Sequence, residues 1–135
     1  MKELTVEAAI ENIEKVTDFI NNELESIGCP MKAEMQIDVA IDELLGNIAR
    51  YAYNPETGKA TVRLEVEENP LAVIITFIDN GKPFNPLDNA DPDVTLSAEE
   101  RSIGGLGIFL VKKTMDMIDY EYKDGQNVLM IKKGW

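Results

Sequence analysis

Three short stretches of the sequence carry residue types whose spacing could support chemistry, and the first lies in a predicted helix. Glu43 and Asn47 are four residues apart and Arg50 follows three residues later, so all three share one helix face. A carboxylate beside an amide oxygen can orient water and hold a hard cation such as Mg²⁺, which prefers oxygen ligands. The same spacing is also typical of a solvated helix face, on which Arg50 is a surface charge.

The second stretch, Ile78 to Phe84, places a carboxylate at the end of an apolar strand. Asp79 could accept a hydrogen bond from an exocyclic amine, and Gly81 would let a flat ring approach the backbone. An ordinary Asn-Gly turn after a strand is the simpler interpretation of the same residues.

Glycines cluster at the start of a further predicted helix, in the stretch Gly104-Gly105-Leu106-Gly107-Ile108. The backbone amides and the positive dipole end at a helix N-terminus together form a ready site for an anion. The stretch is not a P-loop, because no Gly-Lys-Ser/Thr follows, and it lacks the third spaced glycine of a Rossmann fingerprint. A glycine-rich hinge is the competing interpretation.

Periodicity predicts the elements that must position these stretches. Apolar residues recur every three or four positions in three predicted helices, at residues 7–27, 31–52 and 106–117. Alternation and short apolar runs predict strands at residues 2–6, 60–68, 71–78, 118–123 and 126–132, the last two joined by a turn at Asp124-Gly125. This order predicts an α+β fold, a two-layer α/β sandwich with helices on one face of a mixed, mainly antiparallel sheet.

The length of 135 residues fits one domain, residues 1–135, with no interdomain linker. The first helix is predicted to end at Gly28, because a C-cap glycine is followed there by Pro30. Residues 81–104 show no clear period. A loop of this length in a compact domain is most often a functional lid or a disordered stretch.

The charge balance narrows the classes of function. With 25 acidic and 13 basic residues the net charge is −12, which argues against binding to nucleic acid or membrane and suits a basic partner or metal ions. The sequence contains no histidine, which excludes Ser-His-Asp and Cys-His catalysis, His-based zinc sites and self-phosphorylation on histidine. The single cysteine, Cys29, cannot form an internal disulfide and favours a reducing cytoplasm.

The order of the three stretches resembles that in the nucleotide-binding domain of the GHKL ATPases, the superfamily of gyrase, the mismatch-repair and chaperone ATPases and the histidine kinases. The chain resembles above all its smallest members, the bacterial anti-sigma-factor serine kinases. Residues 43–47, 79–84 and 104–111 carry the resemblance, which extends from about residue 4 to residue 131. It implies a Bergerat-type ATP-binding fold, ATP and Mg²⁺ as ligands, and an ATP lid at about residues 84–104.

The resemblance also implies roles for individual residues. In this family a glutamate at the position of Glu43 acts as general base, and the asparagine at Asn47 coordinates Mg²⁺. The aspartate at Asp79 reads the adenine amino group, with Gly81 making room for the ring. Arg50 is a candidate phosphate contact.

The last glycine box of the family closes over the phosphates, which places Gly105 and Gly107 there with the amides of Leu106 and Ile108 pointing inward. Arg101 is the only basic residue between Lys82 and Lys112, and it is a second candidate phosphate contact.

The function that the resemblance implies is that of a cytoplasmic, Mg·ATP-dependent serine/threonine protein kinase that acts as an anti-sigma regulatory factor. Such a protein phosphorylates an antagonist protein and in its other state sequesters a sigma factor, and relatives of this kind tend to form homodimers. The alternative is a nucleotide-gated protein-binding module without kinase turnover. A third interpretation is an α+β domain that binds no nucleotide, in which the three stretches coincide by chance.

Overall fold

The computed structural model describes residues 1–53, 56–88 and 106–135, and these residues form a five-stranded sheet. The strands are β1 (Lys2–Glu7), β2 (Lys59–Glu67), β3 (Ala72–Asp79), β4 (Met117–Lys123) and β5 (Gln126–Gly134). Their order in the sheet is β1-β2-β3-β5-β4, and each of the four pairings is antiparallel. The strands β3 and β4 run in the same direction, but β5 lies between them and pairs antiparallel with both. The described sheet therefore contains no parallel pair.

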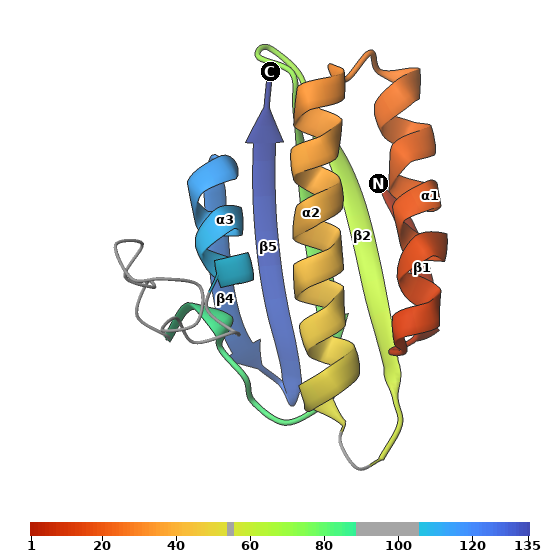
Figure 1. The fold of residues 1–135 in the computed structure, drawn as a ribbon, viewed down its shortest axis with the longest axis vertical. Coiled ribbons are helices and arrows are strands. Elements are labelled where there is room, and N and C mark those ends of the chain that lie inside the picture. The colour runs from red at the N-terminus through yellow and green to blue at the C-terminus, as the bar shows by residue number, and fades with distance from the viewer. Residues whose placement is uncertain (54–55, 89–105) are drawn as a thin grey trace.

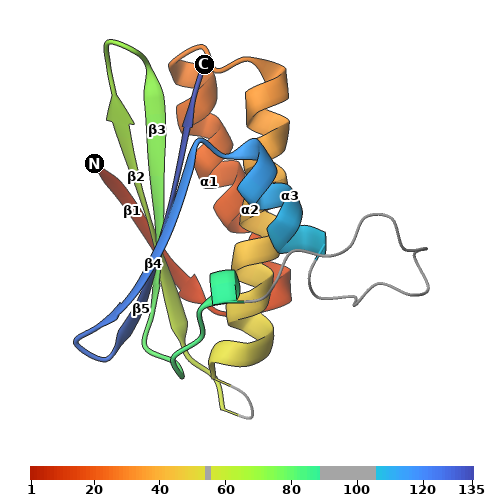
Figure 2. The same cartoon turned by 90° about the vertical axis from the view of Figure 1, so that its left-hand side faces the viewer.

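Among the described residues, three α-helices cover one face of the sheet: α1 (Ile13–Ser26), α2 (Met31–Asn47) and α3 (Leu106–Thr114). Figure 1 shows α2 between α1 and α3, and Figure 2 shows all three helices on the same side of the sheet. The predicted two-layer α+β sandwich is therefore confirmed, and its sheet is antiparallel throughout the described part. No helix in these ranges is long and apolar enough to cross a membrane.

The core lies between the two layers. Fully buried side chains come from the helices (Val16, Ile20, Leu24, Ile37, Ile41 and Leu45) and from the sheet (Val62, Val73, Ile75, Phe77 and Ile131). The helix residues follow a spacing of three or four and the strand residues a spacing of two, as one-sided burial requires. This core fixes α2 over the sheet, and α2 carries the first of the three chemically suggestive stretches.

The start of α1 differs from the prediction. The periodicity predicts a helix from residue 7, but β1 continues to Glu7, which pairs with Lys59 on β2. A 3₁₀ turn at Ile10–Asn12 then leads into α1, which begins at Ile13. Strand pairing outweighs helical periodicity in this segment, because the backbone groups of β1 find partners in the neighbouring strand.

The predicted ends of the first two helices are confirmed, with one change of geometry, whereas the third helix ends at Thr114 instead of residue 117 because β4 begins at Met117. α1 ends just before Gly28, which adopts the left-handed conformation with φ 74°. The second helix reaches Ala52, but its last turn, Ile48–Ala52, is π-helical. Such turns are rare and occur frequently at functional sites.

The hairpin between β4 and β5 is also as predicted. Asp124 and Gly125 have φ values of 54° and 76°, and a two-residue turn of the type I′ class needs two such residues. The turn sets a register in which Tyr120 pairs with Leu129 and Tyr122 pairs with Asn127.

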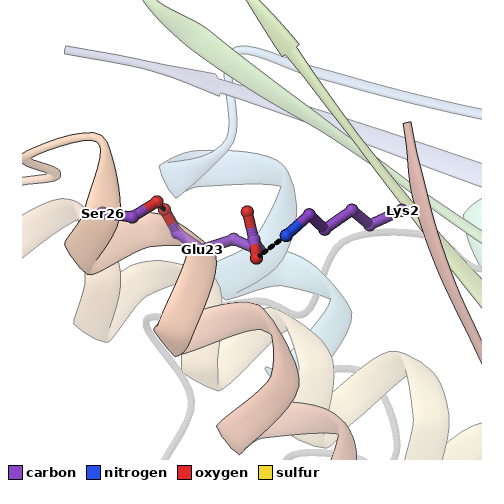
Figure 3. Close-up of polar contacts among 3 residues, drawn as sticks. All are labelled: Lys2, Glu23 and Ser26. Carbon is purple, nitrogen blue, oxygen red and sulfur yellow. Dashed lines mark hydrogen bonds and ion pairs between the residues drawn. The ribbon is translucent and has the colours of Figure 1, made fainter.

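An ion pair connects the edge strand β1 to α1. Lys2 Nζ donates to Glu23 Oε1 at 2.5 Å, and Ser26 Oγ donates to the Glu23 carbonyl oxygen at 2.7 Å. Figure 3 shows the Lys2 side chain extending from β1 toward Glu23 on α1. Such a solvent-accessible pair contributes at most about 1 kcal/mol. Burial of Val6, which is 6% exposed, is therefore the stronger attachment of β1 to the core.

Two buried acceptor atoms on the facing helices α1 and α2, Asn21 Oδ1 and Asp38 Oδ1, have no hydrogen-bond partner among the residues that the structure describes. Neither atom can satisfy the other while Asp38 is ionised, because both then only accept. Burial raises the pKa of the Asp38 carboxyl, and the Asn21 amide opposes part of that shift. Folding therefore favours the protonated form of Asp38.

Asp38→Asn is expected to stabilise the fold by about 1 kcal/mol near pH 7, because an amide at this position can donate to Asn21 Oδ1. The unfolded chain releases the Asp38 proton near pH 3.8, whereas the folded protein releases it at higher pH. Wild-type stability should therefore fall as the pH rises through this window, and the advantage of the variant should grow.

Urea denaturation at a series of pH values measures this difference. Asp18→Asn removes the same charge from an exposed position of α1 and is the matched control, expected to change stability by less than about 0.5 kcal/mol. An Asp38→Asn variant that is less stable than the wild type at pH 7 would contradict the prediction.

Candidate functional site

A pocket opens where the C-terminal end of the second helix meets the ends of β3 and β5. The space that it encloses, with the solvent at its open mouth counted in, is about 390 Å³. The lining is mostly apolar and consists of Leu44, Asn47, Ile48, Ala52, Phe77, Asp79, Phe84, Pro86, Tyr120, Asn127 and Leu129. A lining of this kind suits a flat apolar ring with a few polar groups at its edge.

Asp79 ends β3 and is only 4% exposed. Its Oδ1 accepts hydrogen bonds from the backbone N–H of Gly81 at 2.8 Å and from Asn127 Nδ2 at 2.9 Å. Burial raises the pKa of the Asp79 carboxyl, and these two hydrogen bonds oppose the rise. Oδ2 accepts no hydrogen bond from a described residue, so a ligand in the pocket that carries an N–H group could donate to it.

No sequence pattern singled out Asn127, although its side chain is 5% exposed and pairs with Asp79 across β3 and β5. The amide also bonds to the Lys82 carbonyl, the Phe84 N–H and the Tyr120 hydroxyl. The one available signal was its place in the alternation of β5. Asn127 falls on the same face as the buried apolar residues two and four positions later.

Gly81 lies against the end of the π-helical turn. A Cβ at this position would lie 2.3 Å from the carbonyl oxygen of Ala52, and the same oxygen accepts a hydrogen bond from Lys82 N at 2.8 Å. The requirement for glycine is therefore explained by packing within the chain. That Gly81 also makes room for a ligand ring stays a prediction.

Tyr53 also holds the helix end to the strands. Its hydroxyl donates to the Lys59 carbonyl at 2.6 Å and accepts from Asn80 N at 2.8 Å. Its ring occupies the space beside Gly58, where a Cβ would lie 2.2 Å from Cε1. Burial raises the pKa of the Tyr53 hydroxyl, which keeps the group protonated and able to donate.

The first and third chemical stretches meet where Glu43 contacts Gly107. A Cβ on Gly107 would lie 2.1 Å from Glu43 Oε2, so glycine leaves the space that the carboxylate occupies. Gly107 lies in the first turn of α3, where backbone N–H groups have no partner within the helix. Asn47, one turn after Glu43, lines the pocket. The structure therefore places Glu43 beside α3 and Asn47 beside the pocket.

Arg50 and Ile108, two other predicted phosphate contacts, are not among the residues that line the pocket. Arg50 is exposed and its guanidinium lies beside Gly46, where an added Cβ would be 3.2 Å from Nη2. Leu106 and Ile108 contribute their backbone N–H groups to the first turn of α3, while the Ile108 side chain is buried in the core. The phosphate contacts of these residues stay predictions.

Arg101, Gly105 and most of the predicted lid at 84–104 lie outside the described residues. The described start of that segment forms part of the pocket wall, because Phe84 and Pro86 line the pocket. The Phe84 ring is tilted by 34° against that of Tyr51, with the centroids 5.6 Å apart.

The oxygen atoms near the pocket fit one mode of Mg²⁺ binding. In the described ranges, no group of three or more His, Cys, Asp or Glu side chains could hold a metal ion. Mg²⁺ commonly binds through one or two protein oxygens together with waters and substrate phosphates. Asn47 and Glu43, one turn apart on α2, offer an amide and a carboxylate oxygen for a cation that arrives with a nucleotide.

Comparison with known proteins connects the chain to one family. The family model described as "Histidine kinase-like ATPase domain" matches residues 6–133. A serine-protein kinase RsbW of Listeria monocytogenes is 32% identical over 110 residues, which cover 78% of this chain and 69% of the relative.

Two further relatives carry similar names. A serine-protein kinase RsbW of Bacillus cereus is 32% identical over 98 residues, which cover 70% of this chain and 60% of the relative. A serine/threonine-protein kinase BtrW of Bordetella bronchiseptica is 27% identical over 95 residues, which cover 70% of this chain and 66% of the relative. The aligned part is thus 60% to 69% of the length of each of these three proteins.

Gly81→Ala is expected to destabilise the fold by roughly 3 kcal/mol, because the added Cβ meets backbone atoms of Ala52 that cannot turn away. Gly134→Ala is the control, since its Cβ would lie at an ordinary 3.4 Å from the nearest atoms, and it should change stability by less than about 1 kcal/mol. Urea denaturation compares the two variants, and equal losses would show that the contact with Ala52 is not what requires glycine.

Proposed function

Because this chain belongs to the histidine kinase-like ATPase domain family, we propose that it binds Mg·ATP and transfers the γ-phosphate to a serine or threonine of another protein. The observation that carries the proposal is Asp79, a buried carboxylate with Oδ2 unpaired among the described residues of a largely apolar pocket. The names of the relatives, serine-protein kinase and serine/threonine-protein kinase, support the class of reaction.

The base of the nucleotide binds in the pocket. Adenine has an exocyclic amine that can donate to Asp79 Oδ2, and flat faces that can pack against apolar side chains such as Leu44, Ile48 and Leu129. Removal of water from such a site strengthens the hydrogen bond between the amine and the carboxylate.

The phosphates extend from the pocket toward α3. Mg²⁺, when bound, neutralises triphosphate charge in a chain whose own net charge is −12. Asn47 holds the ion through its amide oxygen, and the first-turn N–H groups of α3 stabilise phosphate oxygens. Glu43 accepts the proton of the attacking hydroxyl. Gly105, Arg101 and Arg50 complete the proposed set of phosphate contacts.

The phosphoacceptor is a separate antagonist protein, and a sigma factor is the second partner, as the resemblance to anti-sigma-factor kinases implies. The chain contains no histidine and so cannot carry the phosphohistidine of a sensor kinase. Its net charge of −12 favours basic partner surfaces. A cytoplasmic setting and a homodimer belong to the same proposal.

Asp79→Asn is expected to weaken Mg·ATP binding at least about tenfold. One end of an amide is a donor, so an amide at this position cannot accept from Gly81 N, from Asn127 Nδ2 and from the adenine amine together. Isothermal titration calorimetry measures the affinity, with Asp119→Asn on the exposed side of β4 as the charge-matched control. Absence of ATP binding to the folded wild type would overturn the proposed function.

Glu43→Gln is expected to lower phosphotransfer by about 100-fold or more, because glutamine cannot accept the hydroxyl proton. ATP affinity should stay within a few-fold of the wild-type value. Incubation with Mg²⁺, γ-labelled ATP and candidate antagonist proteins measures the transfer, and Asp42→Asn, an exposed neighbour on α2, is the control.

Two other outcomes of this phosphotransfer assay would contradict parts of the proposal. Unchanged transfer by Glu43→Gln would exclude Glu43 as the base. A wild type that binds ATP but labels none of the partners supplied would favour the nucleotide-gated binding module over the kinase.

A further inference from the structure

Asn127 uses all four hydrogen-bonding positions of its side-chain amide. Nδ2 donates to Asp79 Oδ1 at 2.9 Å and to the Lys82 carbonyl oxygen at 2.8 Å. Oδ1 accepts from the Phe84 N–H at 3.0 Å and from the Tyr120 hydroxyl. A flipped amide would lose the bonds to Asp79, the Lys82 carbonyl and the Phe84 N–H, since only the Tyr120 hydroxyl can both donate and accept.

These bonds join two walls of the pocket. We call the lining at Asp79 the polar wall. We call the lining at Phe84, whose ring contacts Tyr51, the aromatic wall. Asn127 is bonded to both walls and is 5% exposed, so bulk water has little access to replace its bonds. A change at Asn127 should therefore alter the pocket at both walls at once.

We propose that Asn127 is the positioning residue that makes this pocket select 6-aminopurines over 6-oxopurines. It occupies Oδ1 of Asp79 and leaves Oδ2 as the carboxylate oxygen that a base can reach. The inference rests on the proposed binding of ATP and adds the source of base selectivity.

Selectivity follows from the group that each base carries at C6. The amine of adenine donates to a carboxylate, whereas the carbonyl of hypoxanthine places an acceptor against an acceptor in a desolvated site. Removal of the Asn127 amide frees one bond of Asp79 and leaves polar space that can hold a water molecule. A water between Asp79 and the base can accept from an amine or donate to a carbonyl, so discrimination falls.

The test compares Mg·ATP with Mg·ITP, whose bases differ by this amine and carbonyl, using calorimetry on the wild type, Asn127→Ala and Tyr120→Phe. The wild type is expected to prefer ATP by about 100-fold and Asn127→Ala by less than about tenfold. Tyr120→Phe keeps Asn127 but removes one of its donors, and its preference should lie between the two. This milder variant decides the question if Asn127→Ala does not fold.

Asn12→Ala is the control, because it removes an exposed side-chain amide bond to the Glu7 carbonyl, outside the pocket, and should keep the wild-type preference. A purely structural role would weaken both nucleotides equally, so an unchanged preference in the pocket variants overturns the inference. Equal binding of ATP and ITP by the wild type also overturns it, while the proposed ATP binding stands. A wild type that binds neither nucleotide overturns the proposed function and the inference together.

Discussion

One buried carboxylate sets the geometry of the site. Asp79 is 4% exposed, and a carboxylate removed from water needs hydrogen-bond donors, which here are the Gly81 N–H and the Asn127 amide. Asn127 reaches Asp79 because β3 and β5 pair in a register that places the two residues opposite each other. If β5 were shifted by one residue along β3, Asn127 would turn to the other face of the sheet. The Asp79 carboxylate would then keep only the Gly81 N–H as donor. The register is thus held by polar groups as well as by the apolar core.

The turn after β3 that supplies a donor to Asp79 also contacts the end of the second helix. The turn that lets Gly81 N–H bond to Asp79 also brings Gly81 against Ala52, whose carbonyl accepts from Lys82 N at 2.8 Å. The carbonyl at the end of the π-helical turn therefore has a partner in the segment that follows β3. Since Asn47 lies immediately before this turn, the position of the helix over the pocket depends on the same contact.

Local patterns predicted the elements well, because two-layer packing buries one face of each. The positive φ values at Asp124 and Gly125 and the end of α1 before Gly28 follow from residue type alone. The segment at Ile10–Asn12 was mispredicted because strand pairing at Glu7 depends on a partner 52 residues away, Lys59, which periodicity does not contain. The strand order and the role of Asn127 were missed for the same reason, since both depend on which strands become neighbours.

The two ends of the candidate site differ in how they tolerate change. At the end where we propose that the base binds, hydrogen bonds between strands fix Asp79 and Asn127, and Gly81 meets backbone atoms that cannot yield. At the end where we propose that the phosphates bind, Gly107 meets the tip of the Glu43 side chain, which can rotate at little cost. In the proposed kinase, recognition of a base needs a fixed acceptor, whereas a carboxylate that meets the hydroxyl of a second protein needs room to adjust. The fold supplies the rigid part from paired strands and the adjustable part from a side chain between two helices.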